Sequence, residues 1–413
     1  MMIEVWEATK IINEQVKLLN CDKKYEKIYI LDSLNRVLCE DICSFDNLPP
    51  FDKSAMDGYA IRSCDTQNKE NIILKIKSLV KAGDFCTELL KENEAYKIMT
   101  GAMLPIGSDA VIQIESVKTE NGNLYISQEV KKDNNIIKLG EEILKGDVPL
   151  KKGTLIRPPE IGLLASLGYE FINVYKAPTI GIVITGDELI GIKSEIQRGK
   201  IRNSNEYSLK ALINNANAKV FSVGIVNDDR QSLKEKILLA FENSDIVISS
   251  GGASVGDYDF IKDILNEIGA GTKFTTVAIK PGKPTSFAVY KDKLFFALPG
   301  NPSALINTFE IFVKPAIKSI MGIPANEAEE FPVVLKDEFK TKEGRENYIF
   351  VNIAKEAGVY YAYNAGSQCS NHLRTMCNAN GVIIIPRKCA NVKKGEVLDR
   401  KSTRLNSSHP LDL

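Results

Sequence analysis

Between residues 177 and 322, apolar runs rich in β-branched residues alternate with segments of helical periodicity. The runs TIGIVIT, KVFSVGIV and DIVISS are each followed by a helical segment, and a last helix is expected over SALINTFEIFVKPAIKSIM. We interpret TTVAI and LFFAL as two further strands of the same sheet. Such alternation is typical of βαβ units, in which helices cover both faces of a parallel sheet. The pattern therefore predicts an α/β domain.

The flanking segments have a different character, so the chain of 413 residues is expected to hold more than one domain. Residues 46–146 contain short β-rich runs separated by Gly, Asn and Asp, as in a small β domain. Residues 147–176 return to helix and strand, and residues 326–400 return to short strands. The last segment, 401–413, fits no pattern, and we leave it out of the fold as a non-native tail.

Charge and composition exclude several classes of function. The 53 Lys and Arg residues balance the 53 Asp and Glu residues, which argues against a general nucleic-acid binder. No apolar run reaches the ~18–20 residues that span a bilayer, and the first residues do not resemble a signal peptide. Eight cysteines without a C-x-x-C pair indicate reduced thiols, and two histidines are too few for zinc hydrolase or Ser-His chemistry. We expect a cytoplasmic protein that binds neither nucleic acid nor membrane.

Polar residues follow five of the predicted strands of the α/β domain. The carboxyl ends of parallel strands share one edge of an open sheet, and ligands bind there. We therefore expect the loops to converge on one crevice: Gly186-Asp187-Glu188, Asn227-Asp228-Asp229, the glycine-rich loop SSGGASVGDYD that ends at Asp259, Lys280-Pro281-Gly282-Lys283-Pro284, and Pro299-Gly300-Asn301-Pro302-Ser303.

Each of these loops also has a simpler interpretation. The glycines of SSGGASVGDYD would let backbone N–H groups approach an anion, but this loop could also be a tight turn in which Asp257 or Asp259 caps a helix. The lysines of KPGKP could bind an anion in a proline-stiffened loop, or could be solvated at the surface. Asp228-Asp229 could be a turn, or could supply, opposite Asp259, the oxygen ligands that Mg²⁺ prefers.

Two strings in the β segment are also unusual. PPFDKSAMDGYAIR (49–62) contains Asp57-Gly58, a dipeptide that is a strong signal for a hairpin turn. MTGAMLPIGSDAVI (99–112) could be a Gly/Pro turn before a strand. Neither string indicates a function on its own.

Together these strings resemble one family. PPFDKSAMDGYA, MTGAMLPIGSDAVI, ITGDEL, GKIRNSN, SSGGASVGDYD, AIKPGKP and LPGNPSA, in this order and spacing, are similar to the molybdopterin molybdenumtransferases (MoeA), which include the gephyrin E domain. The resemblance runs from about residue 4 to residue 400. It implies four domains: an elongated discontinuous domain (1–45 with 147–176), an inserted β domain (46–146), a three-layer α/β molybdopterin-binding domain (177–325) and a C-terminal β-barrel domain (326–400).

The resemblance also implies an activity and partners. Members of this family take adenylylated molybdopterin and molybdate, hydrolyse the phosphoanhydride with Mg²⁺, and release molybdenum cofactor and AMP. They form homodimers, in which the active crevice lies between the α/β domain of one subunit and other domains of its partner. The further implied partners are molybdopterin adenylyltransferase and the molybdoenzymes or their chaperones.

The positions that match the family's functional residues fall into three groups. By the resemblance, Asp228 and Asp259 would hold Mg²⁺ against the bridging phosphates. Lys280, Lys283 and Ser370, the last in GSQCSN, would bind the tetrahedral molybdate oxyanion. Asp57, Thr100 and Glu188 would orient the substrate or a water molecule. To these we add substrate-binding residues from the crevice loops: Ser249, Gly251, Gly252, Ser254, Pro299 and Asn301.

The chain departs from the family pattern at two positions. It has Gly140-Glu141-Glu142 where many relatives show Gly-Glu-Asp, and Phe350 stands where several relatives place an arginine that helps to hold molybdate. The loss of a guanidinium removes a bidentate oxyanion contact, which Arg345 or Arg374 could replace. The alternatives are a tungstate enzyme, a molybdopterin adenylyltransferase, and a non-catalytic gephyrin-like scaffold or carrier.

Overall fold

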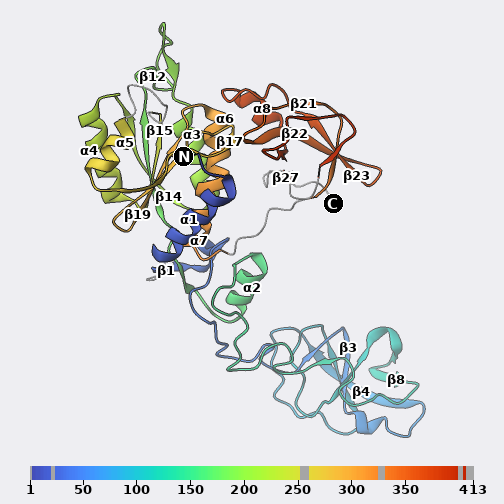
Figure 1. Ribbon diagram of the computed structural model, residues 1–413. Helices are drawn as coiled ribbons and strands as arrows, with labels where there is room; N and C mark the ends of the chain where they lie inside the picture. Colours follow the sequence, from blue (N-terminus) through green and yellow to red (C-terminus); the bar gives the residue numbers. More distant parts are fainter. Residues whose placement is uncertain (1, 20–23, 252–259, 324–330, 399–402, 406–413) are drawn as a thin grey trace. The chain divides into compact units, whose positions relative to one another are not determined.

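The computed structural model describes residues 2–19, 24–251, 260–323, 331–398 and 403–405 (Figure 1). Contacts group the chain into two compact units. Unit 1 is Met1–Glu26, Asn35–Val37 and Val174–Leu413, and unit 2 is Lys27–Leu34 and Leu38–Asn173. The chain passes between the units four times, including once within strand β1 (Tyr25–Tyr29) and once within β10 (Phe171–Tyr175). The boundaries of the four implied domains stay a prediction.

The α/β part of unit 1 is built on a six-stranded sheet of order β14-β11-β15-β19-β18-β16. The first four strands are parallel, whereas β18 and β16 run antiparallel to their neighbours. The strands are β14 (Lys219–Val226), β11 (Thr179–Thr185), β15 (Ile246–Ser250), β19 (Lys293–Leu298), β18 (Ser286–Tyr290) and β16 (Gly271–Phe274).

Two hydrophobic cores lie on the two faces of this sheet. Successive side chains of a strand point to opposite faces, so Ile182 of β11 packs in one core and Val183 in the other. The first core contains side chains of α3 (Asn205–Asn215) and α6 (Pro302–Thr308), and the second those of α4 (Arg230–Asn243) and α5 (Phe260–Glu267). Burial on both faces explains why these strands are continuous apolar runs.

The predicted last helix of the α/β domain is confirmed as one helical run with an irregular middle. It comprises α6, a π-helical turn η5 (Phe309–Val313) and α7 (Lys314–Ile320). Pro315 lacks the N–H that would close an α-helical bond, and an inserted turn of this kind accommodates such a break. Helix α1 (Val5–Leu19) packs on this run through Ala8, Ile12 and Val16, which share one face.

Two expectations for the α/β sheet were wrong. The run TTVAI supplies only β17 (Ile279–Lys280), which pairs parallel with β22 (Glu346–Glu356) of a different sheet. The sheet is also not wholly parallel, because the run SFAVY forms β18 in a hairpin with β19. The hairpin turn is Lys291-Asp292, with Lys291 at φ +54°, and a two-residue turn between apolar runs is the signal that would have predicted it.

The last part of unit 1 is a β domain whose strands follow the order β26-β20-β23-β22-β24-β27, with β17 attached to β22. Its core contains Leu335, Val351, Ile353 and Ile383. Thr403–Leu405, which we had left out of the fold, pairs with β24 as strand β27. The other elements are β26 (Val397–Leu398), β20 (Val333–Leu335), β23 (Val359–Asn364), β22 (Glu346–Glu356), β24 (Gly381–Ile385), α8 (Leu373–Asn378), and the pair β21 (Phe339–Lys340) and β25 (Asn391–Val392).

Unit 2 contains a second six-stranded sheet, of order β6-β3-β5-β4-β8-β7. Only β4 and β5 are parallel neighbours. Its strands are β6 (Ala110–Gln113), β3 (Gly58–Ile61), β5 (Glu94–Ile98), β4 (Ile72–Val80), β8 (Asn123–Ile126) and β7 (Lys118–Glu120), and β2 (Lys53–Ser54) pairs with β9 (Ile136–Ile137) beside them. The predicted β segment and the mixed α/β and β fold class are thus confirmed. No helix in the described part of the chain is long and apolar enough to cross a membrane.

Candidate active site

The loops after β11 and β14 meet at the carboxyl edge of the α/β sheet. Thr185, the last residue of β11, donates its hydroxyl hydrogen bond to Oδ1 of Asp228, which follows β14. The backbone N–H of Asp228 donates to Oδ1 of Asp187 at 3.1 Å. Asp228 is half-buried, whereas Asp187 and Glu188 are exposed. The convergence predicted for these two loops is therefore confirmed.

The two aspartates that follow β14 have different surroundings. Asp229 is the N-cap of α4, and its Oδ2 accepts from the backbone N–H of Ser232 at 2.8 Å. Hydrogen bonding from Ser232, first from its backbone N–H and then from its side chain, lowers the pKa of Asp229. Asp229 thus caps a helix, a role that we did not predict for it, while Asp228 points its Oδ1 toward Thr185.

The loops after β15 and β19 are joined through helix α3. Nδ2 of Asn205 donates to Oγ of Ser250 at 3.0 Å and to the carbonyl oxygen of Gly300 at 2.7 Å. Gly251 has φ +94°, and a Cβ there would lie 2.0 Å from the carbonyl oxygen of Thr185. Only glycine fits so close to a neighbouring backbone. Because Gly251 has no side chain, the start of the glycine-rich loop packs against the end of β11.

Of the substrate-binding residues predicted in these loops, Ser249 and Pro299 are buried. The hydroxyl of Ser249 has no hydrogen-bond partner within the described residues. Gly252, Ser254 and Asp259 lie outside the described residues, so their placement is not tested. Glu188 lies over the backbone of Gly186, since a Cβ on Gly186 would be 2.7 Å from Oε2 of Glu188.

The Lys280–Pro284 loop reaches the site from a different sheet than expected. Its strand β17 pairs with β22, yet the loop packs on α6 of the α/β domain. Nδ2 of Asn307 donates to the carbonyl oxygen of Pro281 at 3.0 Å, and a Cβ on Gly282 would lie 2.4 Å from Cγ2 of Thr308. Lys280 is half-buried and Lys283 is exposed. The lysine loop is thus held by the last two residues of α6, the helix that begins directly after the LPGN loop.

Ser370 of the C-terminal β domain is fixed at the start of α6. Its Oγ accepts from Nδ2 of Asn301 at 2.9 Å, which confirms that these two predicted residues lie together. The carbonyl oxygen of Ser370 accepts from the backbone N–H of Ser303 at 3.1 Å and from Oγ of Ser303 at 2.6 Å. Ser303 is the last residue of the Pro299–Ser303 loop that we predicted at the crevice, but no role was predicted for Ser303 itself.

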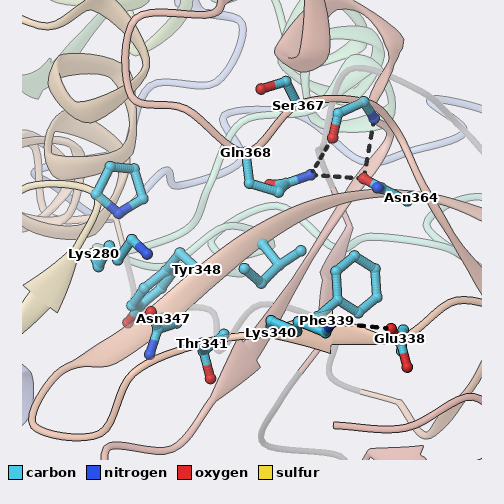
Figure 2. Close-up of a pocket in the computed structure, with 13 residues that line it drawn as sticks. Lys280, Glu338, Phe339, Lys340, Thr341, Asn347, Tyr348, Asn364, Ser367 and Gln368 are labelled. Carbon is cyan, nitrogen blue, oxygen red and sulfur yellow. Dashed lines mark hydrogen bonds and ion pairs between the residues drawn. The ribbon is translucent and has the colours of Figure 1, made fainter. Parts of the chain in front are cut away.

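A cavity of about 240 Å³ lies beside this contact, between Lys280 and the C-terminal β domain (Figure 2). Gln368 lines it and fixes the loop that carries Ser370. The side-chain oxygen of Gln368 accepts from the backbone N–H of Phe350 at 3.0 Å, and its Nε2 donates to the carbonyl oxygen of Phe350 at 3.0 Å. Buried Oδ1 of Asn347, a further lining residue, has no partner within the described residues.

Phe350, one of the two positions that depart from the family pattern, is buried. Phe350 is 7% exposed and lies in β22, where it pairs with Val382 of β24. Of the two arginines considered as replacements, Arg345 precedes β22 and is half-buried, and Arg374 is exposed in α8. Neither forms an ion pair with another described residue. The oxyanion role of either arginine stays a prediction.

Unit 2 holds a second group of predicted residues. Oδ1 of Asp57 accepts from the backbone N–H of Thr100 at 2.7 Å and from its hydroxyl at 2.8 Å. The strings that contain Asp57 and Thr100 are also joined by backbone hydrogen bonds between Ser54 and residues 101 and 102. The strands on either side of Asp57, β2 and β3, pair with other strands, so the expected hairpin turn at Asp57-Gly58 was wrong.

Thr100 also controls the charge of Asp57. The backbone N–H of Thr100, followed by its hydroxyl, lowers the pKa of Asp57, because both hydrogen bonds favour the ionised carboxylate. A carboxylate whose pKa is lowered by folding stabilises the protein above its ordinary pKa, and this stabilisation is lost as the pH falls through the lowered pKa. Asp57 is therefore ionised at neutral pH.

We expect Thr100→Val to raise the pKa of Asp57 toward its ordinary value while leaving it below neutrality. The variant removes the hydroxyl donor and keeps the backbone N–H, so the shift is partial. A carbon-detected NMR titration of the Asp57 carboxyl measures it, with Thr100→Ser as the matched control that retains the hydroxyl. An unchanged pKa in Thr100→Val would show that the side chain does not hold the carboxylate.

The described residues can supply part of a magnesium site. They contain no group of three or more His, Cys, Asp and Glu side chains arranged around a possible metal ion. Mg²⁺ is, however, usually bound by one or two carboxylates together with water and substrate phosphates. Asp228, with Asp187 hydrogen-bonded to its backbone, fits this requirement.

The chain was compared with known families and structures. Family models match in order: the MoeA N-terminal region (domains I and II) at residues 3–168, a probable molybdopterin-binding domain at 181–319, and the MoeA C-terminal region (domain IV) at 332–400. The molybdopterin molybdenumtransferase of Staphylococcus aureus (strain MSSA476) is 35% identical over 405 residues, which are 96% of this chain and 94% of the relative. That of Haemophilus influenzae is 34% identical over 90% of this chain and 92% of its own length.

A crystal structure of the molybdopterin biosynthesis moeA protein from Pyrococcus horikoshii OT3 is similar over nearly the whole chain. It superposes with a TM-score of 0.80 at 30% sequence identity, and the match covers 98% of this chain and 100% of that one. Together with the family models and the relatives, this confirms the resemblance found in the sequence motifs. The chain belongs to the molybdopterin molybdenumtransferase (MoeA) family.

Proposed function

We propose that this protein inserts molybdate into adenylylated molybdopterin, with hydrolysis of the phosphoanhydride and release of AMP. The proposal is supported by Asp228, which follows β14, and by the Asn301–Ser370 pair, which follows β19 of the same sheet at the start of α6. Carboxylates and oxyanion-binding groups are the two chemistries that this reaction needs. Relatives that align over almost their full length carry the name of this activity.

The carboxylate part of the site would handle the phosphates. Asp228 and Asp259 would hold Mg²⁺, which, when bound, would neutralise the charge that develops on the phosphate oxygens as AMP leaves. The absence of a side chain at Gly251 leaves room for a phosphate close to the backbone. Asp57, Thr100 and Glu188 would orient the substrate or the attacking water, with Asp57 ionised and so able to accept a hydrogen bond.

The other part of the site would hold molybdate. Lys280 and Lys283 would supply positive charge, and the hydroxyl of Ser370 and the amide of Asn301 would supply hydrogen bonds to the oxyanion. The hydrogen bonds of Gln368 to the backbone of Phe350 hold the loop that carries Ser370. The hydrogen bond from Ser303 fixes Ser370 itself, so its hydroxyl is in place before the substrate binds. Such preorganisation reduces the cost of ordering the loop when the anion binds.

A homodimer is part of the proposal. The two groups of site residues lie in different units: Asp57 and Thr100 in unit 2, and the Asp228 edge with the Ser370 loop in unit 1. In the family arrangement that the sequence motifs imply, the two groups that form one active site come from different subunits. Molybdopterin adenylyltransferase and molybdoenzymes or their chaperones are the proposed partners, in the cytoplasm.

The alternatives differ in what they do with the substrate. An adenylyltransferase would need only the α/β domain, whereas the matches to the MoeA N-terminal and C-terminal regions account for the rest of this chain. A carrier or scaffold would bind adenylylated molybdopterin without hydrolysing it. AMP release from the purified protein, measured by chromatography with and without molybdate, separates these functions: tight binding without release would contradict the proposal.

Phe350→Arg tests the departure from the family pattern. A guanidinium at this position would add a bidentate oxyanion contact, so we expect AMP release to reach half its maximum at about tenfold lower molybdate concentration. Phe350→Leu, which changes packing without adding charge, is the matched control and should not lower this concentration. An unchanged molybdate dependence in Phe350→Arg would show that position 350 does not contribute to the oxyanion site of this chain.

A further inference from the structure

The environment of Asp228 contains a residue to which neither the sequence motifs nor the family comparisons assigned a role. Thr185 is 2% exposed, and its hydroxyl donates to Oδ1 of Asp228. The β-branched side chain of threonine has few rotamers at the end of a strand, so this hydroxyl has a fixed direction. The backbone of Asp228 is fixed independently by its hydrogen bond to Asp187. One oxygen of the carboxylate is therefore held, and no donor among the described residues contacts the other, Oδ2.

The same arrangement occurs in unit 2. There the hydroxyl of Thr100 donates to Oδ1 of Asp57, and the family pattern includes both residues among the functional set. Thr185 and Asp228 repeat this pairing at the edge of the α/β sheet. A buried threonine that served only the fold could donate to a nearby backbone carbonyl instead, as Thr308 does to Ala304.

Thr185 also contacts the glycine-rich loop. Its carbonyl oxygen lies where a Cβ on Gly251 would be 2.0 Å away, so the backbone of β11 packs directly on the start of this loop. One residue thus contacts both Asp228 and Gly251, the first residue after β15. A shift of Thr185 would move the Asp228 carboxylate and the first residue of the glycine-rich loop relative to each other.

We propose that Thr185 is a positioning residue that presents Oδ2 of Asp228 to the divalent cation. The inference rests on the proposed function, in which Asp228 holds Mg²⁺. Mg²⁺ demands near-ideal octahedral geometry, so a carboxylate that rotates freely binds it less well. Residues that hydrogen-bond to metal ligands typically contribute ~10–100-fold to metal affinity.

The test compares variants that remove the hydroxyl of Thr185 with a variant that keeps it. Thr185→Val removes the donor and keeps a β-branched side chain of similar shape, and Thr185→Ser keeps the donor. Thr185→Ala removes the donor without adding volume, and replaces Thr185→Val if that variant does not fold. Thr66→Val is the matched control, because it removes a fully buried hydroxyl from unit 2, where Thr66 binds the backbone of Ser63 and Val130.

Metal affinity is measured directly with Mn²⁺ as the probe, by electron paramagnetic resonance of the free ion, in the presence of AMP. We expect Thr185→Val to weaken Mn²⁺ binding ~10–100-fold, Thr185→Ser to restore it to within about threefold, and Thr66→Val to leave it unchanged. The Mg²⁺ concentration that gives half-maximal AMP release should rise by the same factor. The melting temperature of each variant is recorded alongside.

The outcomes separate the inference from the proposed function. Lower melting temperature in Thr185→Val with unchanged Mn²⁺ affinity would overturn the inference, because the hydroxyl would then serve only the fold. Loss of Mn²⁺ binding in Asp228→Asn but not in Thr185→Val would also overturn it, while leaving the proposed function intact. Absence of Mn²⁺ binding to the unmodified protein with AMP would contradict the proposed metal site itself, and with it the role of Thr185.

Discussion

Asp228→Asn is expected to reduce molybdate-dependent AMP release by ~10²–10³-fold without unfolding the protein. The substitution keeps the size of the side chain and its bond to Thr185, but it removes the negative charge that would hold Mg²⁺. Loss of one preorganised electrostatic group in an active site has an effect of this size. The rate is measured at saturating substrate, and circular dichroism checks the fold.

The neighbouring aspartate provides the control. Asp229 caps α4 through the backbone N–H of Ser232, and asparagine is as good an N-cap as aspartate. Asp229→Asn should therefore retain the activity of the unmodified protein. Equal losses in Asp228→Asn and Asp229→Asn would indicate a general effect on this loop, and full activity in Asp228→Asn would contradict the assignment of Asp228 as a metal ligand. Asp259→Ala extends the test to the second proposed ligand and is expected to abolish AMP release.

Mixing two inactive variants is expected to restore activity. Asp57→Asn alters unit 2 and Asp228→Asn alters unit 1, and each alone should be nearly inactive. If the active site is shared between subunits, a mixed dimer has one site with both substitutions and one site with neither. Random exchange makes half of the dimers mixed, so about a quarter of the full activity should return.

The controls for this experiment are simple. Two variants of the same group, Asp228→Asn and Asp259→Ala, should not restore each other, because every site would still contain one altered residue. The variants are unfolded and refolded together, and the dimer is isolated before AMP release is measured. If no activity returns although mixed dimers form, each active site belongs to a single subunit and the proposed sharing is wrong.

The strands buried on both faces were the most predictable elements. TIGIVIT became β11 with the predicted bounds and DIVISS became β15, because continuous apolar runs of this kind suit a parallel sheet covered by helices. TTVAI looks the same in the sequence, but its partner, β22, comes much later in the chain. Composition shows that a segment is extended, and does not show which sheet it joins.

Site residues could be predicted where the sequence matches the motifs of the family. They could not be predicted where a role depends on a contact that only the folded chain shows. Asp57 and Thr100 are 43 residues apart, and only the resemblance linked them before their hydrogen bonds were seen. In Asp228-Asp229, two identical side chains have different tasks, and the helix that begins at Arg230 distinguishes them. No role was predicted for Thr185 or Ser303, because a strand end and a helix start give no sign of the side chains they contact.

The central claim is that this chain couples AMP release to the insertion of molybdenum. The most direct measurement supplies the purified protein with adenylylated molybdopterin, Mg²⁺ and molybdate, and compares the AMP released with the molybdenum bound to the pterin product. We expect equal amounts of both, AMP release that depends on molybdate, and a product that activates a cofactor-free molybdoenzyme. AMP release that ignores molybdate, or bound substrate that is never cleaved, would contradict it.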